Sequence, residues 1–198
     1  MTRSITDPSL ALRLAHLDDL PAIEELISAS ARGLSLGYYT PLQIDSLVQH
    51  AFAADRQLIA DGTYYVCPID GELAAVGGWS RRRTLHGGDR TGDAGELPLD
   101  PATDAARIRA FFVHPAHARR GLGRALLTRC MAEAAAAGFR RLTLVATLPG
   151  EPLYRAAGFL VRRRFVLELP DGVTAEVSEM EREIGGAPPP FRRYIPLP

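Results

Sequence analysis

A glycine-containing basic turn joins a strand-like segment to a long helical segment in the middle of this chain. Residues 107–113 read as a strand, and Gly121 lies in the turn that follows. From there to about residue 137, apolar and small residues recur at helical spacing. Because a strand, a tight turn and a helix are consecutive here, the chain is constrained to a fold that mixes strands and helices.

The first turn of this helix has the features of an anion-binding site. Backbone N–H groups at a helix N-terminus have no intrahelical acceptor, and the helix dipole favours negative charge there. Gly121 and Gly123 lack a Cβ, so a ligand can lie against the backbone. Arg119, Arg120 and Arg124 add formal positive charge. We therefore predict a phosphorylated ligand at this turn.

The spacing of the glycines narrows the class of ligand. A dinucleotide-binding fingerprint would place glycine at position 126, where this chain has Leu126, and the Gly-Lys-Ser/Thr end of a phosphate-binding Walker loop is absent. On its own, the Gly121-Leu122-Gly123 sequence is weak evidence, because glycines before helices also serve only as turns. A turn without a ligand is therefore the alternative interpretation of this segment alone.

A second motif follows at residues 153–159, which read Leu-Tyr-Arg-Ala-Ala-Gly-Phe. Together with Ala-Arg-Arg-Gly-Leu-Gly at residues 118–123, it resembles the acyl-CoA-binding core of the GNAT superfamily of N-acetyltransferases. That family has Arg/Gln-x-x-Gly-x-Gly/Ala, then an aromatic-Tyr or Leu-Tyr pair and Gly-Phe. Ala118 departs from the first signature position, and the two arginines after it can supply the missing charge. The resemblance covers about residues 10–184 and is strongest over 107–159.

The resemblance implies an N-acetyltransferase that uses acetyl-CoA as cosubstrate and an amine of a small molecule or peptide as acceptor. The basic turn would hold the CoA pyrophosphate, and backbone groups of Phe112 and Val113 would pair with the pantetheine arm as an added strand. A backbone N–H near Phe112 would polarise the thioester carbonyl. The residues implied for cofactor binding are Phe112, Val113, Arg119, Arg120, Gly121, Leu122, Gly123, Arg124 and Ala125.

Tyr154 matches the family tyrosine that protonates the departing thiolate. Reference pKa values are about 10 for tyrosine and about 8.5 for a thiol, so this proton transfer is uphill by roughly 2 kcal/mol before site effects. Desolvation can remove the deficit by raising the pKa of the thiol. The alternative is that Tyr154 only packs against the CoA chain.

The general base and the acceptor pocket are less constrained. Residues 107–113 contain no carboxylate, so a chain of waters or a residue of the long loop at 81–106 would take the amine proton. The loop candidates are His86, Asp89, Asp93 and Glu96. Three aromatic residues near predicted element ends are candidates to contact the acceptor, or else belong to the core: Tyr38, Tyr39 and Trp79.

Residue patterns along the chain predict an α/β fold. We expect a mixed, predominantly antiparallel sheet with helices on both faces, because hairpin signals at Asp70-Gly71 and Asp171-Gly172 accompany a strand–helix–strand–helix unit. Thr40 is expected to cap one helix, and Asp18 or Asp19 an earlier one. Residues 1–184 would form one domain, and residues 185–198 a Pro-rich extended tail, for which a contact within a homodimer is one possible role.

Composition excludes several classes of protein. The chain has 23 basic and 23 acidic residues and a formal net charge of zero, which argues against nucleic-acid or anionic-membrane binding. Arginine triplets at 81–83 and 162–164 are expected on solvated faces. No segment has the roughly 20 apolar residues needed to span a bilayer, and two cysteines do not indicate a disulfide framework. We expect a cytoplasmic enzyme without a metal site.

Two other functions fit the same motifs. A non-catalytic acyl-CoA-binding module would use the glycine turn while Tyr154 only packs, and a nucleotide-binding regulatory domain would use the turn for another phosphorylated ligand. Comparing the binding of acetyl-CoA, CoA and NADH distinguishes the nucleotide-binding domain from the two acyl-CoA-binding functions. Release of thiol from acetyl-CoA distinguishes the enzyme from the binding module.

Overall fold

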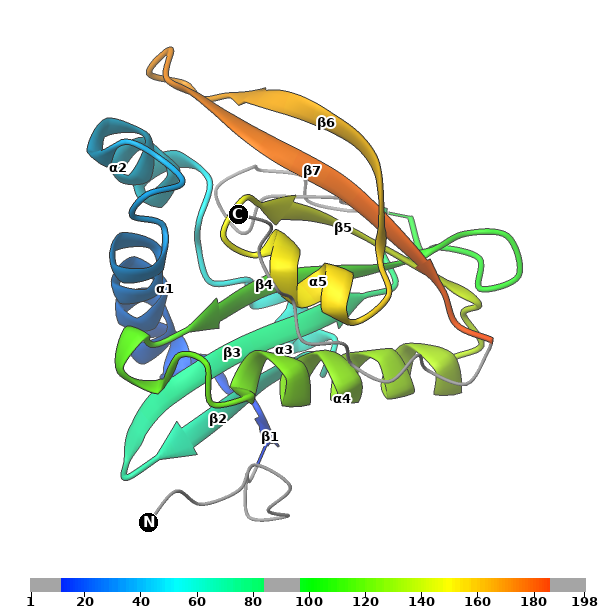
Figure 1. The fold of residues 1–198 in the computed structure, drawn as a ribbon. Helices are drawn as coiled ribbons and strands as arrows, with labels where there is room; N and C mark the ends of the chain where they lie inside the picture. The colour runs from blue at the N-terminus through cyan, green and yellow to red at the C-terminus, as the bar shows by residue number, and fades with distance from the viewer. Residues whose placement is uncertain (1–11, 84–96, 186–198) are drawn as a thin grey trace.

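The computed structural model describes residues 12–83 and 97–185. In these residues a seven-stranded sheet has the order β1-β2-β3-β4-β5-β7-β6, with helices on both faces (Figure 1). Neighbouring strands are antiparallel except for β4 and β5, which are parallel. The predicted mixed, predominantly antiparallel α/β fold is therefore confirmed.

The elements follow the order of the sequence pattern closely. The strands are β1 (Arg13–Leu14), β2 (Tyr64–Ile69), β3 (Glu72–Ser80), β4 (Ala106–Val113), β5 (Arg141–Thr147), β6 (Leu160–Glu168) and β7 (Thr174–Glu183). The helices are α1 (Leu20–Leu34), α2 (Pro41–His50), α3 (Arg56–Ala60), α4 (Leu122–Ala136) and α5 (Glu151–Ala156), with 3-10 turns η1 (Leu17–Asp19) and η3 (Pro115–His117). Within the two described ranges, no helix is long and apolar enough to cross a membrane.

Both predicted hairpins form. Asp70 and Gly71 have φ values of 52° and 89°, which is the conformation that a two-residue turn between twisted strands requires. The β6–β7 hairpin turns at Gly172, whose φ is 80°, and closes with a hydrogen bond from Leu169 N–H to Val173 O of 2.9 Å. Because both signals are local, the sequence pattern was sufficient to place them.

The helix caps agree with the sequence only in part. Thr40 caps α2 as predicted, accepting from Gln43 N–H at 3.3 Å. Asp19, in contrast, makes no side-chain cap of α1; its carboxylate accepts from His16 N–H and from the Arg13 guanidinium. The hydrogen bond from Arg13 holds the pKa of Asp19 below its usual value. Asp19 therefore ties β1 to the start of the helical segment.

The two sides of the sheet carry separate apolar cores. Helix α4 covers one face with Leu122, Leu126 and Leu127, and α1 covers the other with Ile23 and Ile27. A third, smaller cluster joins α2 to the β6–β7 hairpin. Burial of apolar area on both faces fixes the sheet between the helices.

The long loop at 81–106 is more closely attached than its composition predicts. Residues 84–96 lie outside the described residues. After them, Leu99 is buried in the core under α4, and its N–H donates to Arg81 O at 2.7 Å. Arg82 pairs with Asp61 at 2.7 Å, so the second residue of the first arginine triplet is not simply solvated. A single leucine was too little signal to predict this packing.

Gly78 provides a test of how closely β3 approaches α3 and the α3–β2 connection, because a Cβ there would lie 2.8 Å from Leu58 Cδ1 and 2.9 Å from the Thr63 carbonyl oxygen. We expect Gly78→Ala to lower the free energy of unfolding by about 1–3 kcal/mol, since a backbone atom cannot move aside cheaply. The control is Gly185→Ala, where nothing lies within 4 Å. Urea denaturation measures both variants, and equal free energies would contradict the close approach of β3 to the α3–β2 connection.

Candidate active site

Strands β4 and β5 pair only where they begin. Ala106 pairs with Leu142 and Arg107 with Thr143, whereas β4 continues to Val113 and β5 to Thr147. Beyond the two pairs the strands diverge, as Figure 1 shows. The edge of β4 that faces β5 is therefore not used by a neighbouring strand over most of its length, and it can accept an extended ligand.

A bulge at Ala110 accompanies this divergence. Val76 pairs with Phe112 and Gly78 with Arg109, so β4 has one residue more than β3 over the same stretch. Ala110 takes the left-handed conformation, with φ of 54°. A bulge bends its strand and increases the local twist, and so turns the end of β4 away from β5. Nothing in the sequence marks it, because alanine is not a residue that favours this conformation.

The direction of the β4 backbone groups follows from one hydrogen bond. His114 N–H donates to Ala74 O of β3 at 2.8 Å. By strand alternation, Phe112 also directs its N–H toward β3, whereas Val113 directs its N–H away from it. Val113 N–H donates to the Ser30 hydroxyl at 3.2 Å. Of the two residues predicted to pair with a ligand, Val113 therefore directs its backbone N–H away from β3, on the side of β4 that β5 leaves unpaired.

The glycine turn forms an uncapped helix N-terminus. Gly121 is the N-cap of α4 with φ of 88°, and no side chain caps it. Arg119 has φ of 63°, so the turn bends sharply before the helix starts. The side chains of Arg119, Arg120 and Arg124 are exposed around it. The arrangement has the unsatisfied N–H groups and the positive charge that an anion needs.

The two sequence motifs meet in space. A Cβ on Gly123 would lie 3.1 Å from Leu153 Cδ2 and 3.7 Å from Val113 Cγ2. Helix α5 therefore packs against the N-terminus of α4 and the end of β4. The absence of a side chain at Gly123 serves this packing as well as the approach of a ligand.

Tyr154 is next to Leu153 in α5 and is 7% exposed. Its ring makes edge-to-face contacts with Phe111 and Phe159, with centroids 6.2 and 5.8 Å apart. Burial raises the pKa of Tyr154, and the nearby Cys130 thiol acts in the same direction. The hydroxyl is protonated at neutral pH, but its raised pKa also makes it a weaker acid, so donation to a thiolate requires that burial raise the pKa of the thiol as well.

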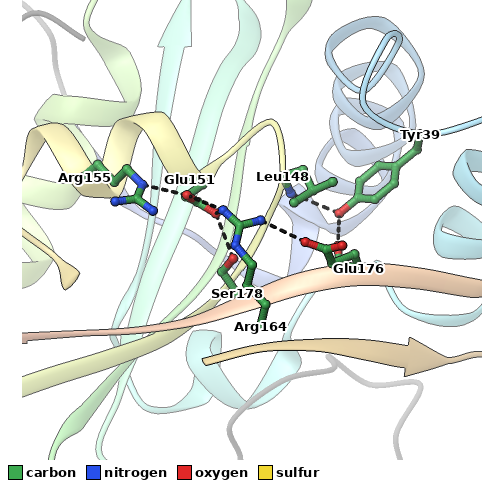
Figure 2. Close-up of polar contacts among 7 residues, drawn as sticks. All are labelled: Tyr39, Leu148, Glu151, Arg155, Arg164, Glu176 and Ser178. Atoms are coloured by element: carbon green, nitrogen blue, oxygen red, sulfur yellow. Dashed lines mark hydrogen bonds and ion pairs between the residues drawn. The ribbon is translucent and has the colours of Figure 1, made fainter. Parts of the chain in front are cut away.

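The three predicted acceptor aromatics take different positions. Tyr39 is 6% exposed, and its hydroxyl donates to Glu176 O at 2.6 Å and accepts from Leu148 N–H at 3.0 Å (Figure 2). Tyr38 is 51% exposed. Trp79 belongs to the core under α4, where it packs against Phe139.

Tyr38 borders a shallow pocket of about 220 Å³, together with residues of α5, of the segment before it and of β6. The other lining residues are Leu148, Glu151, Pro152, Arg155 and Arg164. The structure thus brings Tyr38 to a surface that a small molecule can reach, whereas Tyr39 serves as a buried link between three segments. Trp79 is not brought to this pocket.

Sequence reasoning missed the polar cluster at the start of α5. Glu151 accepts hydrogen bonds from Arg155, Arg164 and Ser178 (Figure 2). Arg164 belongs to the triplet expected on a solvated face, yet it is directed to this buried carboxylate. The available signal was an acidic residue in the first turn of a short helix, which is also a common feature of helices without any such cluster.

No general base is assigned. The four loop candidates, His86, Asp89, Asp93 and Glu96, lie outside the described residues. A buried carboxylate does contact β4, because Asp55 Oδ2 lies 2.9 Å from Arg109 Nη2. Its Oδ1 accepts from Leu58 N–H at the start of α3. Both oxygens are thus engaged, which makes Asp55 a structural partner of β4 rather than a base.

Comparison with known proteins identifies the family. The sequence profile described as the Acetyltransferase (GNAT) family matches residues 23–159. This range contains β4, the glycine turn, α4 and α5, and it ends at Phe159. No curated protein sequence matches the chain significantly.

Solved structures share the fold at low sequence identity. A GCN5-related N-acetyltransferase from Rhodopseudomonas palustris aligns with a TM-score of 0.66 and 19% identity, over 88% of this chain and 95% of its own. The YncA protein of Salmonella typhimurium, a putative acetyltransferase solved with acetyl-CoA, gives 0.58 and 18% over 91% and 96%. The PaiA N-acetyltransferase of Thermoplasma acidophilum, solved with coenzyme A, gives 0.57 and 14% over 88% and 98%.

The contrast between the adjacent tyrosines can be tested by removing each hydroxyl. We expect Tyr39→Phe to lower the free energy of unfolding by about 1–3 kcal/mol, because it leaves Leu148 N–H and Glu176 O without their partner. Tyr38→Phe is the matched control and should change it by less than about 0.5 kcal/mol. Equal unfolding free energies in urea would show that Tyr39 is not a structural link.

Proposed function

This chain belongs to the Acetyltransferase (GNAT) family, and we propose that it transfers the acetyl group of acetyl-CoA to a primary amine of a small molecule or peptide by direct attack. One observation carries the proposal. Where β4 has left β5, Tyr154 packs against Phe111 of β4, and the uncapped start of α4 at Gly123 lies close to Leu153 of α5 and Val113 of β4. The pantetheine arm would use the unpaired edge of β4, the pyrophosphate the start of α4, and the leaving thiolate the hydroxyl of Tyr154.

Binding of acetyl-CoA would use backbone groups more than side chains. Val113 would pair with the pantetheine arm as an added strand, whereas Phe112, predicted for the same role, directs its N–H toward β3. The ligand would replace the Ser30 hydroxyl as the acceptor of the Val113 N–H. The pyrophosphate would accept from the N–H groups of residues 121–125, with Arg119 and Arg120 adding charge around it.

The chemistry then requires two proton movements. The neutral amine attacks the thioester carbonyl, and a backbone N–H at the bulge, near Phe112, stabilises the developing oxyanion. Collapse breaks the C–S bond, and Tyr154 donates its proton to the sulfur. The amine proton leaves to water, which also restores the tyrosine hydroxyl. Tyr154 thus loses one proton to the sulfur and regains one from water in each turnover.

Tyr38 is the described aromatic residue best placed to contact the acceptor. It lies in the α1–α2 connection, is half exposed, and borders the pocket at the start of α5. The side chains of Tyr39 and Trp79 are buried. We propose that these two residues shape the site through packing.

Binding and turnover can be tested on the unmodified protein. We expect acetyl-CoA and CoA to raise the melting temperature, since a ligand at 100 times its Kd stabilises by about 2.7 kcal/mol. NADH, which also has a pyrophosphate but no pantetheine, is the matched control and should have no effect. Stabilisation by NADH alone would overturn the assignment of the turn to CoA.

Release of free thiol from acetyl-CoA should then depend on an added amine. The measurement is thiol formation across a panel of primary amines, with the product confirmed by mass. Binding of CoA without thiol release on any member of a broad panel would reduce the protein to an acyl-CoA-binding module.

Removing the hydroxyl of Tyr154 tests its role as acid. We expect Tyr154→Phe to bind acetyl-CoA nearly as well, because its ring still packs between Phe111 and Phe159. Its kcat should fall by up to about 10²–10⁴-fold, less where water substitutes as donor. Tyr65→Phe, another buried tyrosine, is the control and should keep its kcat. Wild-type kcat in Tyr154→Phe would leave this residue with a packing role only.

A further inference from the structure

The helix that carries Tyr154 is too short to fix its own position. Helix α5 contains six residues, and Tyr154 is the fourth. Isolated helices shorter than about 12–15 residues are marginal in water. The direction of the Tyr154 hydroxyl therefore depends on contacts that the rest of the protein makes with α5.

The N-terminal end of α5 is held by Glu151, which is 7% exposed. Ser178 of β7 donates to Glu151 Oε2 at 2.7 Å, and Arg164 Nη2 of β6 lies 3.0 Å from both carboxylate oxygens (Figure 2). Burial alone would raise the pKa of Glu151, but hydrogen bonds from Ser178 and Arg155 outweigh it and hold the pKa below its usual value. The carboxylate is thus ionised and bound to both strands of the hairpin.

The C-terminal end of α5 is held from the same hairpin. Arg182 of β7 donates to the carbonyl oxygen of Ala157, the C-cap of α5. A cation at this position satisfies a free carbonyl and is favoured by the helix dipole. The same guanidinium lies 3.5 Å from Met131 Sδ of α4, so it also connects α5 to the helix beside it.

We propose that the β6–β7 hairpin positions the proton donor: Glu151, Arg164 and Ser178 hold one end of α5, Arg182 holds the other, and together they fix Tyr154 against the leaving thiolate. Glu151 and Arg164 also line the pocket beside Tyr38. The role proposed for them here is to position Tyr154, through which they act. The proposal rests on the proposed function, because the exact place of this hydroxyl affects a rate only where it donates the proton.

The hairpin itself provides a matched control. Arg163 is adjacent to Arg164 in β6 but lies on the other face of the sheet, where it pairs with Glu179. Its side chain is 63% exposed. Removing its charge costs the same hairpin one ion pair and the cation–π contact with Phe165, without touching α5.

The experiment compares Glu151→Gln, Arg164→Gln and Arg163→Gln, each alone and combined with Tyr154→Phe. We expect Glu151→Gln and Arg164→Gln to lower kcat by about tenfold, since a misplacement of 1 Å can cost up to about 100-fold. Their KM for acetyl-CoA should change by less than about twofold, and Arg163→Gln should match the wild type. In the Tyr154→Phe background neither substitution should lower kcat further, because no proton donor remains to be positioned.

The pH dependence of kcat provides a second measurement, because a loss of stability alone does not change it. The titratable group that faces Tyr154 among the described residues is the Cys130 thiol of α4, which is also buried. Release of α5 admits water to the Tyr154 hydroxyl and lowers its raised pKa toward about 10. The acid must stay protonated, so the alkaline fall in kcat should move to lower pH in Glu151→Gln and stay in place in Arg163→Gln.

These results distinguish failure of the positioning role from failure of the proposed acetyl transfer. Equal losses from Glu151→Gln with and without the Tyr154 hydroxyl would overturn the positioning role, even if the wild type is fully active. Wild-type kcat in Tyr154→Phe overturns the acid and the positioning role together, while amine-dependent thiol release still supports the enzyme. Arg164→Lys keeps the charge and is the control for misfolding. Partial recovery of kcat relative to Arg164→Gln supports the proposal. No recovery of kcat at an unchanged melting temperature contradicts it.

Discussion

The extra residue of β4 determines how the rest of this structure is arranged. Between Gly78 and Val76 of β3, β4 advances by three residues while its partner advances by two. The added residue, Ala110, takes a left-handed conformation that costs an alanine of order 1 kcal/mol. In return β4 bends away from β5, and the two strands pair only at Ala106 and Arg107. A continuous sheet would bury the same backbone groups in ladder hydrogen bonds and leave no edge for an extended ligand. Gly77, opposite the bulge, leaves space for the Phe111 ring.

Features that depend on a few neighbouring residues could be predicted from the sequence. The Asp70-Gly71 hairpin, the Thr40 cap and the glycine turn before α4 are each specified by residues within one turn of chain. The bulge could not be predicted, because Ala110 carries no glycine signal and the bulge exists only in the register between two strands. Likewise Arg164 looked like part of an exposed triplet, and only the distance between β6 and α5 decides where it points. Tyr38 and Tyr39 are neighbours of equal chemistry, and their opposite burial is a property of the assembled fold.

Charge in this protein is arranged locally. The formal net charge is zero, so long-range attraction for an anionic cosubstrate is small. The α4 turn instead combines unsatisfied N–H groups with exposed arginines, whose effect extends over about one Debye length of 8–10 Å. On the β6–β7 hairpin, arginines face glutamates across the ladder, as in the pairs of Arg162 with Glu181 and Arg163 with Glu179. Exposed pairs of this kind contribute little stability each. The pair of Arg164 with Glu151 differs because its carboxylate is buried and because it connects the hairpin to α5 rather than one strand of the hairpin to the other.

The pair of Arg164 with Glu151 lies partly outside the residues that match the family profile. The profile match ends at Phe159, which includes Tyr154 but not β6 or β7. Every residue with which the hairpin holds α5, namely Arg164, Ser178 and Arg182, lies beyond it. The proposed proton donor thus lies inside the matched range, and the contacts that would orient it lie outside it. A short helix makes this division possible, because six residues have too little stability of their own to resist an external constraint. A match to the shared motif therefore identifies Tyr154 as a candidate acid, whereas the contacts that would position it are found only in the three-dimensional structure.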